Sequence, residues 1–127
     1  MESDGISDSQ ISASSEHEID VNHAAIQGRL NFQETSVKAG AWAAATNDVN
    51  QWLQVDLGKQ FTKVTRVATQ GRNYSSQWPG SHGQWVTKYK VRYSEDGVNF
   101  HSYREQGQNT AKVIILCFTN KTFQLIN

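Results

Sequence analysis

The stretch NQWLQVDLGKQ, residues 50–60, alternates apolar and polar residues and then stops at a glycine. Leu53, Val55 and Leu57 share one face of an extended chain, because successive side chains of a strand point to opposite faces. The other face then carries the remaining residues of the run: Trp52, Gln54 and Asp56. The pattern predicts a β-strand that ends at a turn over residues 58–60.

Asp56 is the acidic residue at the end of this predicted strand. A catalytic carboxylate needs a partner acid, base or metal within reach. The spacing of acidic and histidine residues in this sequence supplies no such partner. We therefore predict that Asp56 accepts hydrogen bonds from backbone or turn donors at the strand end.

Further segments alternate in the same way. The run VTKYKVRYS, residues 86–94, places Lys88, Lys90 and Arg92 on one face. Its opposite face carries the other alternating residues: Thr87, Tyr89, Val91 and Tyr93. The turn signal at 95–97 predicts a hairpin. The return strand of this hairpin covers residues 98–103. A further strand is predicted over residues 64–69, and a weaker pattern predicts one over residues 9–13.

Helix signals are poor, because Val, Thr, Ser, Asn and aromatic residues crowd the middle of the chain. The run GAWAAA, residues 40–45, is too short for a stable helix and is predicted as one helical turn or a tucked loop. Short strands separated by turns, with almost no helix, predict an all-β sandwich or jelly roll.

Bulk composition narrows the function classes. A chain of 127 residues is predicted to form one domain. Twelve basic and twelve acidic residues cancel, so no net charge draws the chain to nucleic acid. The longest apolar run, Val113–Phe118, is too short to span a bilayer, and residues 1–5 do not begin a secretion signal. The sequons at Asn73 and Asn120 leave secretion open.

The residues that carry metal or covalent chemistry are sparse. The single cysteine, Cys117, excludes an internal disulfide and cysteine metal motifs. The four histidines lack the spacing of a zinc site: His17, His23, His82 and His101. Calcium held by loop oxygens stays open as a cofactor, with no ligand set assigned. No nucleophile motif or phosphate loop is present, so we predict that the chain is not an enzyme.

Five motifs occur in an order that resembles the discoidin domain, also called the coagulation factor V/VIII type C domain. They are ISDSQISASS (6–15), GRLN (28–31), AWAAATNDVNQWLQVDLG (41–58), VTRVATQGR (64–72) and WVTKYKVRYSEDGVNF (85–100). The resemblance implies a galactose-binding-like jelly-roll β-sandwich with ligand loops at one end. It also implies a non-catalytic extracellular or cell-surface module that binds phospholipid head groups, carbohydrates, collagen or other proteins.

The resemblance covers residues 1–113, which we predict to be an incomplete discoidin-like domain. An opening cysteine expected of the family is missing, and residues 114–127, IILCFTNKTFQLIN, form an apolar tail that does not align. The C-terminal strands are therefore expected to be missing or replaced. Two accounts compete: an incomplete or mispredicted gene product, which we favour, or a variant whose tail supplies a substitute strand.

By position, three segments resemble the ligand-facing loops of the family: 18–27, 45–50 and 73–84. The first has two acids and no Trp or Phe, which disfavours tight phospholipid binding because acids repel an anionic surface. The third offers aromatic and amide side chains that suit carbohydrate or protein recognition. The candidate ligand-binding residues are Asp20, Asn22, His23, Asn47, Asp48, Arg72, Asn73, Tyr74, Trp78 and His82.

Several of these residues have a structural alternative. Trp78 either stacks on a ligand or packs under its own loop, and Arg72 either pairs with a ligand carboxylate or sulfate or meets a neighbouring acid. We predict that the other three tryptophans belong to the core or its lid: Trp42, Trp52 and Trp85. The charged face of Lys88, Lys90 and Arg92 either contacts sulfated glycosaminoglycans or, as is more common, is a solvated sheet face.

These features together predict a recognition module in cell or matrix adhesion. Its expected partner is a carbohydrate or a matrix or cell-surface protein, with membrane lipid less favoured and no nucleic acid. Two alternatives stay open, a phospholipid head-group binding module and a non-functional fragment of a larger discoidin-domain protein.

Overall fold

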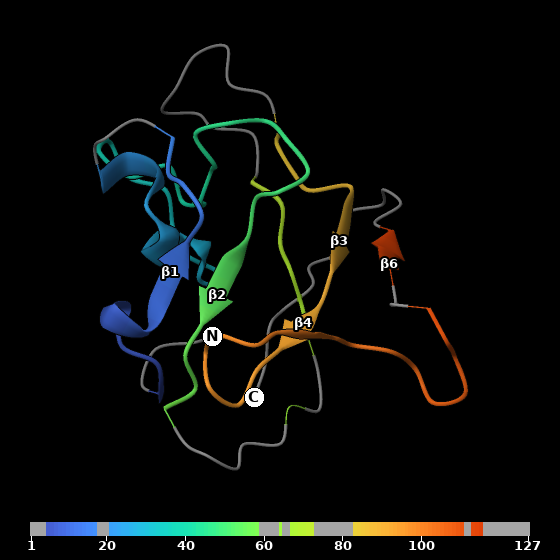
Figure 1. The fold of residues 1–127 in the computed structure, drawn as a ribbon. Coiled ribbons are helices and arrows are strands. Elements are labelled where there is room, and N and C mark those ends of the chain that lie inside the picture. The colour runs from blue at the N-terminus through green and yellow to red at the C-terminus, as the bar shows by residue number, and fades with distance from the viewer. Residues whose placement is uncertain are drawn as a thin grey trace. The chain divides into compact units, whose positions relative to one another are not determined.

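The computed structural model describes residues 5–17, 21–58, 64, 67–72, 83–110 and 113–115 (Figure 1). The chain forms two compact units that divide between Gln84 and Trp85. The described elements of the first unit are η2 (Asp8–Gln10), β1 (Ile11–Ala13), η3 (Val21–His23), η4 (Ala25–Gly28) and β2 (Leu53–Val55). Those of the second unit are β3 (Lys88–Lys90), β4 (Arg92–Tyr93), β5 (His101–Ser102) and β6 (Val113–Ile115).

The helical turns of the described residues are all short 3-10 helices, as the shortage of helix-forming residues predicts. The segment 40–45 lies in loop and bend structure, which agrees with the predicted tucked loop. In the described part of the chain, no helix is long and apolar enough to cross a membrane.

The first unit is built on the antiparallel pair of β1 and β2. Ile11 faces Val55 and Ala13 faces Leu53 across the pair. Backbone hydrogen bonds continue the pairing beyond both ends, from Ser14 N to Trp52 O at 3.0 Å and from Asp56 N to Gln10 O at 2.8 Å. The strand predicted from NQWLQVDLGKQ is therefore confirmed, although regular strand pairing is confined to the three residues of β2 at its centre.

Asp56 lies at the end of the strand and accepts a hydrogen bond from the turn that follows, as the sequence predicts. The Asp56 carboxylate accepts the backbone N–H of Gly58 at 2.8 Å, and Gly58 has a positive φ of 65°. The Gln10 side chain donates to the Asp56 carbonyl at 2.7 Å. The prediction that Asp56 satisfies turn donors is confirmed. Of the strand predicted over residues 64–69, the described residues 64 and 67–69 lie outside any strand.

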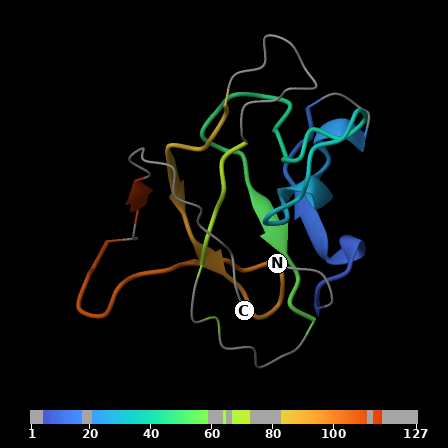
Figure 2. The same cartoon turned by 180° about the vertical axis from the view of Figure 1, so that it is seen from behind.

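A small buried group holds the 3-10 turns to the sheet. η4 packs beside β1 in both views (Figures 1 and 2). The buried apolar side chains of the described residues are Ile11, Ala25 and Ala39. Gln27 is only 1% exposed, and its side-chain oxygen accepts the backbone N–H of Gly40 at 3.1 Å. This hydrogen bond ties η4 to the loop that precedes β2.

The second unit contains the predicted hairpin. β4 and β5 pair antiparallel, with Arg92 opposite Ser102 and Tyr93 opposite His101. The turn between them is organised by Asp96, whose carboxylate accepts the backbone N–H groups of Val98 and Asn99 at 2.9 and 2.7 Å. These hydrogen bonds, led by that from Asn99, hold the pKa of Asp96 well below its ordinary value.

β3 pairs with β6 in antiparallel register, with Lys88 opposite Ile115 and Lys90 opposite Val113. Residues at the start of the predicted tail therefore supply hydrogen-bond partners to β3. This pairing is the behaviour expected of the account in which the tail contributes a strand.

Two tryptophans that we predicted in the core or its lid lie outside the buried group. Trp52 is 48% exposed and Trp85 is 46% exposed. Trp52 precedes Leu53 by one residue, so strand alternation turns it to the opposite side of the chain. Trp85 lies ahead of β3, outside the strands of the described residues. Trp42 is half-buried, and its indole N–H donates to the Ser15 carbonyl at 2.9 Å.

Candidate functional site: the end loops

The loop at residues 45–50 is anchored to the β1–β2 frame by the side chain of Gln51. Its amide oxygen accepts the hydroxyls of Ser14 and Ser15 at 2.7 and 2.6 Å. Its amide nitrogen donates to Thr46 Oγ1 at 2.8 Å and to Asp48 Oδ1 at 3.1 Å. One glutamine thus joins the end of β1 to the loop, so the base of the loop is fixed by side-chain hydrogen bonds.

The tip of this loop carries one charged and one apolar side chain. Asp48 accepts the backbone N–H of Asn50 at 2.7 Å, and this bond, followed by that from Gln51, keeps the pKa of Asp48 below its ordinary value. Val49, the next residue, is 98% exposed. Asn47 is also exposed. The loop therefore presents an ionised carboxylate, an amide and an apolar group to solvent.

The first loop is held by backbone contacts around η3 and η4. The carbonyls of Asn22 and His23 accept the N–H groups of Ala39 and Ala43 at 2.9 and 3.3 Å. The rings of His17 and His23 meet edge to face at 5.3 Å between centroids. The candidate residues Asn22 and His23 are both half-buried. Their backbones contribute to structure, whereas Asp20 lies outside the described residues.

Glu16 supports the same loop in a way that the sequence did not reveal. Its carboxylate accepts the backbone N–H of Ala25 at 2.6 Å, at the start of η4. An acidic side chain at a helix start satisfies a backbone donor that has no partner within the helix. The residues lie nine apart along the chain, beyond the spacing of a local capping motif. Only the fold brings them together.

The third loop is closed at its base by an antiparallel bridge between Arg72 and Gln84. Their backbones exchange two hydrogen bonds of 2.7 and 3.2 Å, and Arg72 Nη1 donates to Gln84 Oε1 at 3.3 Å. Arg72 is half-buried, and its Nε has no hydrogen-bond partner among the described residues. The other predicted residues of this loop lie outside the described part of the chain: Asn73, Tyr74, Trp78 and His82.

The structure thus brings Asn47 and Asp48 together in one loop and fixes Arg72 at the base of another. Gln51, the residue that organises the 45–50 loop, was not among the predicted site residues. Among the described residues, no group of three or more His, Cys, Asp or Glu side chains is placed to hold a metal ion.

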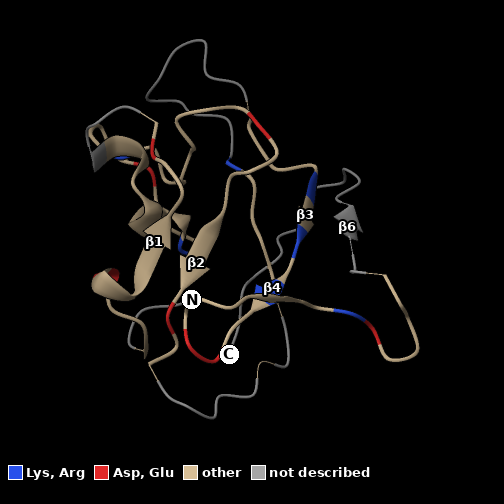
Figure 3. Ribbon diagram, viewed as in Figure 1, with Lys and Arg blue, Asp and Glu red and all other residues tan. Residues whose placement is uncertain are grey.

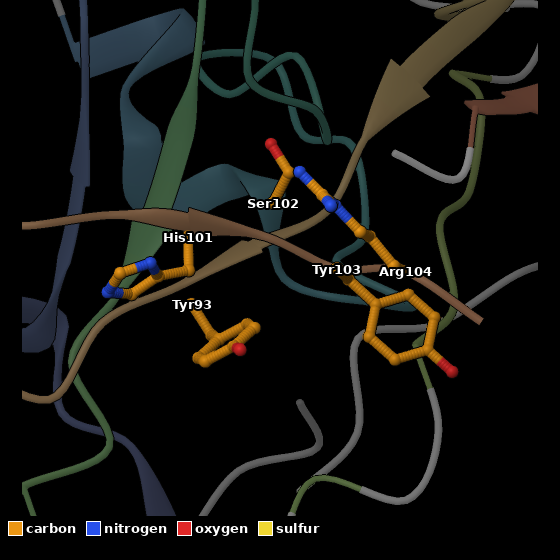
Figure 4. Close-up of a pocket in the computed structure, with 5 residues that line it drawn as sticks. All are labelled: Tyr93, His101, Ser102, Tyr103 and Arg104. Carbon is orange, nitrogen blue, oxygen red and sulfur yellow. The ribbon is translucent and has the colours of Figure 1, made fainter. Parts of the chain in front are cut away.

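The second unit has a different surface chemistry. Lys and Arg residues lie along β3 and β4 (Figure 3). A shallow pocket of about 510 Å³ is formed on the hairpin by five residues: Tyr93, His101, Ser102, Tyr103 and Arg104 (Figure 4). The Tyr93 and His101 rings lie 5.8 Å apart. Since mostly exposed side chains form this pocket and its residues were not predicted to bind ligand, we do not assign the site of recognition to it.

A protein-family model described as the F5/8 type C domain matches residues 10–125. The chain belongs to this discoidin family. The match continues past the boundary that we predicted at Val113. The fold class is therefore the galactose-binding-like β-sandwich of the family, and the antiparallel strand pairs of the described residues agree with an all-β class.

Several curated proteins resemble the chain. It is 40% identical to lactadherin of Rattus norvegicus over 115 residues, which cover 89% of the chain and 25% of that protein. It is 39% identical to coagulation factor V of Sus scrofa over 88 residues, 68% of the chain and 4% of that protein. It is 37% identical to EGF-like repeat and discoidin I-like domain-containing protein 3 of Homo sapiens over 123 residues, 96% of the chain and 24% of that protein.

The discoidin-family chain spans a quarter or less of the length of these relatives. The family consists of non-catalytic extracellular binding modules, which agrees with the predicted class.

Proposed function

We propose that this chain is a non-catalytic extracellular recognition module that binds a carbohydrate or a matrix protein through its end loops. The observation that carries the proposal is the anchoring of the 45–50 loop by Gln51, which fixes the base while the tip stays exposed. A loop held in one conformation loses less conformational entropy when it binds. Recognition loops on a rigid scaffold are common in proteins.

Arg72 is proposed as the charged anchor of the site. It is half-buried and bridged to Gln84, so its guanidinium is held near the base of the third loop. Guanidinium groups pair with carboxylate and sulfate oxygens in a planar, bidentate geometry. Trp78 and Tyr74 are proposed to add ring stacking on a sugar face or an aliphatic side chain.

Phospholipid head groups are the second candidate, and one observation favours them. Val49 is an almost fully exposed apolar side chain at a loop tip, which is a feature suited to a membrane interface. Its neighbour Asp48 carries a carboxylate, whose pKa is lowered further by the hydrogen bond from Asn50, and a carboxylate is repelled by an anionic surface. The balance supports carbohydrate or protein over lipid.

The test is an array of unsulfated glycans and matrix proteins, probed with the chain and with Arg72→Ala and Trp78→Ala. Each substitution is expected to weaken binding about tenfold or more, as large anchors in binding sites do. Arg92→Ala and Trp52→Ala are matched controls, because both residues are exposed and lie outside the three loops. Unchanged binding in both loop variants would contradict the assignment of the binding site to Arg72 and Trp78. Preferential binding of phosphatidylserine vesicles, lost in Val49→Asp, would instead establish the lipid candidate.

A further inference from the structure

The outer face of β3 and β4 carries a row of basic side chains. Lys88, Lys90 and Arg92 are exposed, whereas Tyr89 and Val91 between them are half-buried. Since alternate residues of an extended chain share a face, the three cations point to the same, solvent-facing side. Neighbours in the row are spaced by about 6.4–6.8 Å, twice the rise per residue of a strand.

Arg104 extends this row across the hairpin. Ser102 lies directly opposite Arg92 in the β4–β5 register. Figure 4 shows Ser102 and Arg104 on one side of the β5 ribbon, with the rings of Tyr93 and His101 on the other. The Arg104 side chain is exposed and, two residues after Ser102, belongs to the same face of the extended chain as Ser102 and its strand partner Arg92. We call Lys88, Lys90, Arg92 and Arg104 the basic face.

The basic face is not neutralised by nearby acids. None of its four side chains makes an ion pair with another described residue. The Asp96 carboxylate is engaged by the amides of the hairpin turn. Residues 85–127 contain six Lys and Arg against three Asp and Glu, whereas residues 1–84 contain six against nine. The neutral total of the chain therefore conceals an excess of basic residues in the sequence of its second half.

Like charges gathered on neighbouring strands lower the stability of a sheet. A single exposed ion pair between one of these cations and a ligand anion contributes little to affinity. A chain of regularly spaced anions forms ion pairs with all four cations at once, so the weak contributions add. An anionic lipid surface is the competing polyanion, and the experiment below separates it from a polysaccharide. A sulfated polysaccharide is a linear chain of anions, and such a chain matches a row of cations along one strand better than a flat bilayer surface does.

We propose that the basic face binds a sulfated glycosaminoglycan chain through Lys88, Lys90, Arg92 and Arg104. This surface and this partner go beyond the recognition that we propose for the end loops. The loops take their ligand through Arg72 and the aromatic side chains of the third loop. The basic face instead binds by charge and spacing along a strand.

The test measures binding of the whole chain to immobilised heparin and to chemically desulfated heparin at several salt concentrations. The triple variant Lys88→Gln, Lys90→Gln, Arg92→Gln is expected to bind heparin at least about tenfold more weakly, with a shallower dependence on salt. The control Lys59→Gln, Lys63→Gln, Arg66→Gln removes the same charge from the first half of the chain and is expected to bind within about threefold of the unmodified chain.

Equal losses in the two triple variants would overturn the proposal, because net charge alone would then explain binding. Equal binding of desulfated heparin would overturn it as well. Tighter binding to phosphatidylserine vesicles, lost in the same triple variant, would assign the basic face to membranes instead. Should the triple variant fail to unfold cooperatively, the exposed single change Arg104→Gln takes its place, with a loss of about threefold expected. Binding of that variant at the level of the unmodified chain would overturn the proposal.

Discussion

The two units of this chain hold their surfaces in different ways. In the first unit, the 3-10 turns and loops are tied to the β1–β2 pair by buried Gln27, by Gln51 and by Glu16. In the described part of the second unit, residues 85–110 are all exposed or half-buried, and order comes from strand pairing and the Asp96 turn. The first unit therefore presents fixed loops, whereas the second presents long cationic side chains along a strand.

The difference between the units explains why we assign them different ligands. Shape recognition of a sugar ring or protein pocket gains from loops that are ordered before binding. Recognition of a polyanion depends on the number and spacing of charges and tolerates mobile lysine and arginine side chains. Substitutions that act on one unit only test this difference between the two units.

The largest effect is expected at Gly40. It has a φ of 70°, and a Cβ placed there would lie 2.9 Å from the backbone N of Glu34. Gly40→Ala is therefore expected to lower the free energy of unfolding by about 2–4 kcal/mol, through backbone strain and a contact that cannot relax by side-chain motion. Urea unfolding followed by near-UV circular dichroism measures the change.

Gly107→Ala is the matched control in the second unit. Gly107 also has a positive φ, of 84°, but a Cβ there meets no heavy atom within 4 Å. We expect a loss of about 1 kcal/mol, the cost of the left-handed backbone alone. Equal losses at the two glycines would contradict the close packing of the first unit. Absence of a cooperative transition in the unsubstituted chain would favour the non-functional fragment.

A smaller effect is expected from Gln51→Met, which keeps the size of the side chain and removes its hydrogen bonds. The free energy of unfolding should fall by about 1–2 kcal/mol, because two serine hydroxyls and Thr46 each lose one hydrogen-bond partner. Binding through the 45–50 loop should weaken as well. Gln54→Met is the control, since the Gln54 side chain makes no hydrogen bond to another described residue. If the control loses as much stability, Gln51 does not anchor the loop.

The contribution of the hairpin turn to stability is expected to depend on pH. Because the pKa of Asp96 is lowered on folding, its ionised form stabilises the hairpin above the unfolded value of 3.8, and this contribution is lost as pH falls through the lowered value. The stability gap between the chain and Asp96→Asn should therefore be widest near neutral pH and shrink below pH 3.8. Urea unfolding at neutral pH, near the unfolded value and well below it measures the gap.

Asp56→Asn is the matched control for this pH series. Its carboxylate accepts one backbone N–H among the described residues, from Gly58, whereas that of Asp96 accepts two. The gap for Asp56→Asn should be smaller at neutral pH. A gap for Asp96→Asn that does not change with pH would show that the turn does not depend on the charge.

Local patterns in the sequence predicted the frame of the fold well. The alternation of apolar and polar residues predicted β2, and the turn signal at 95–97 predicted the hairpin of β4 and β5. Both predictions succeeded because the faces of a strand and the residues of a turn are set by the local sequence. The structural role of Asp56 was predicted because the sequence offers no catalytic partner, acid, base or metal ligand, at a suitable spacing. Alternation also separates Trp52 from Leu53, since the two residues lie on opposite faces, and Trp52 is outside the buried group. The general preference of large aromatic residues for burial was the weaker guide.

The supports of the candidate site could not be read from the sequence. Gln51 contacts Ser14 and Ser15 from a distant part of the chain, and Gln27 meets Gly40 across a loop. Such contacts depend on the tertiary fold and leave no local pattern in a single sequence. The candidate residues Asn22 and His23 show the converse, because their backbones also hold the loop in place. The ligand role of the predicted residues stays a prediction.

The most direct test measures both ligands on one surface array with two variants. Arg72→Ala alters the end loops, and the Lys88, Lys90 and Arg92 triple glutamine variant alters the basic face. We expect Arg72→Ala to bind the unsulfated glycan or matrix protein about tenfold more weakly and heparin as tightly as the unmodified chain. We expect the triple variant to bind heparin about tenfold more weakly and the unsulfated glycan or matrix protein unchanged. Loss of the same ligand in both variants, or of neither ligand in either variant, would contradict the separation of the two surfaces.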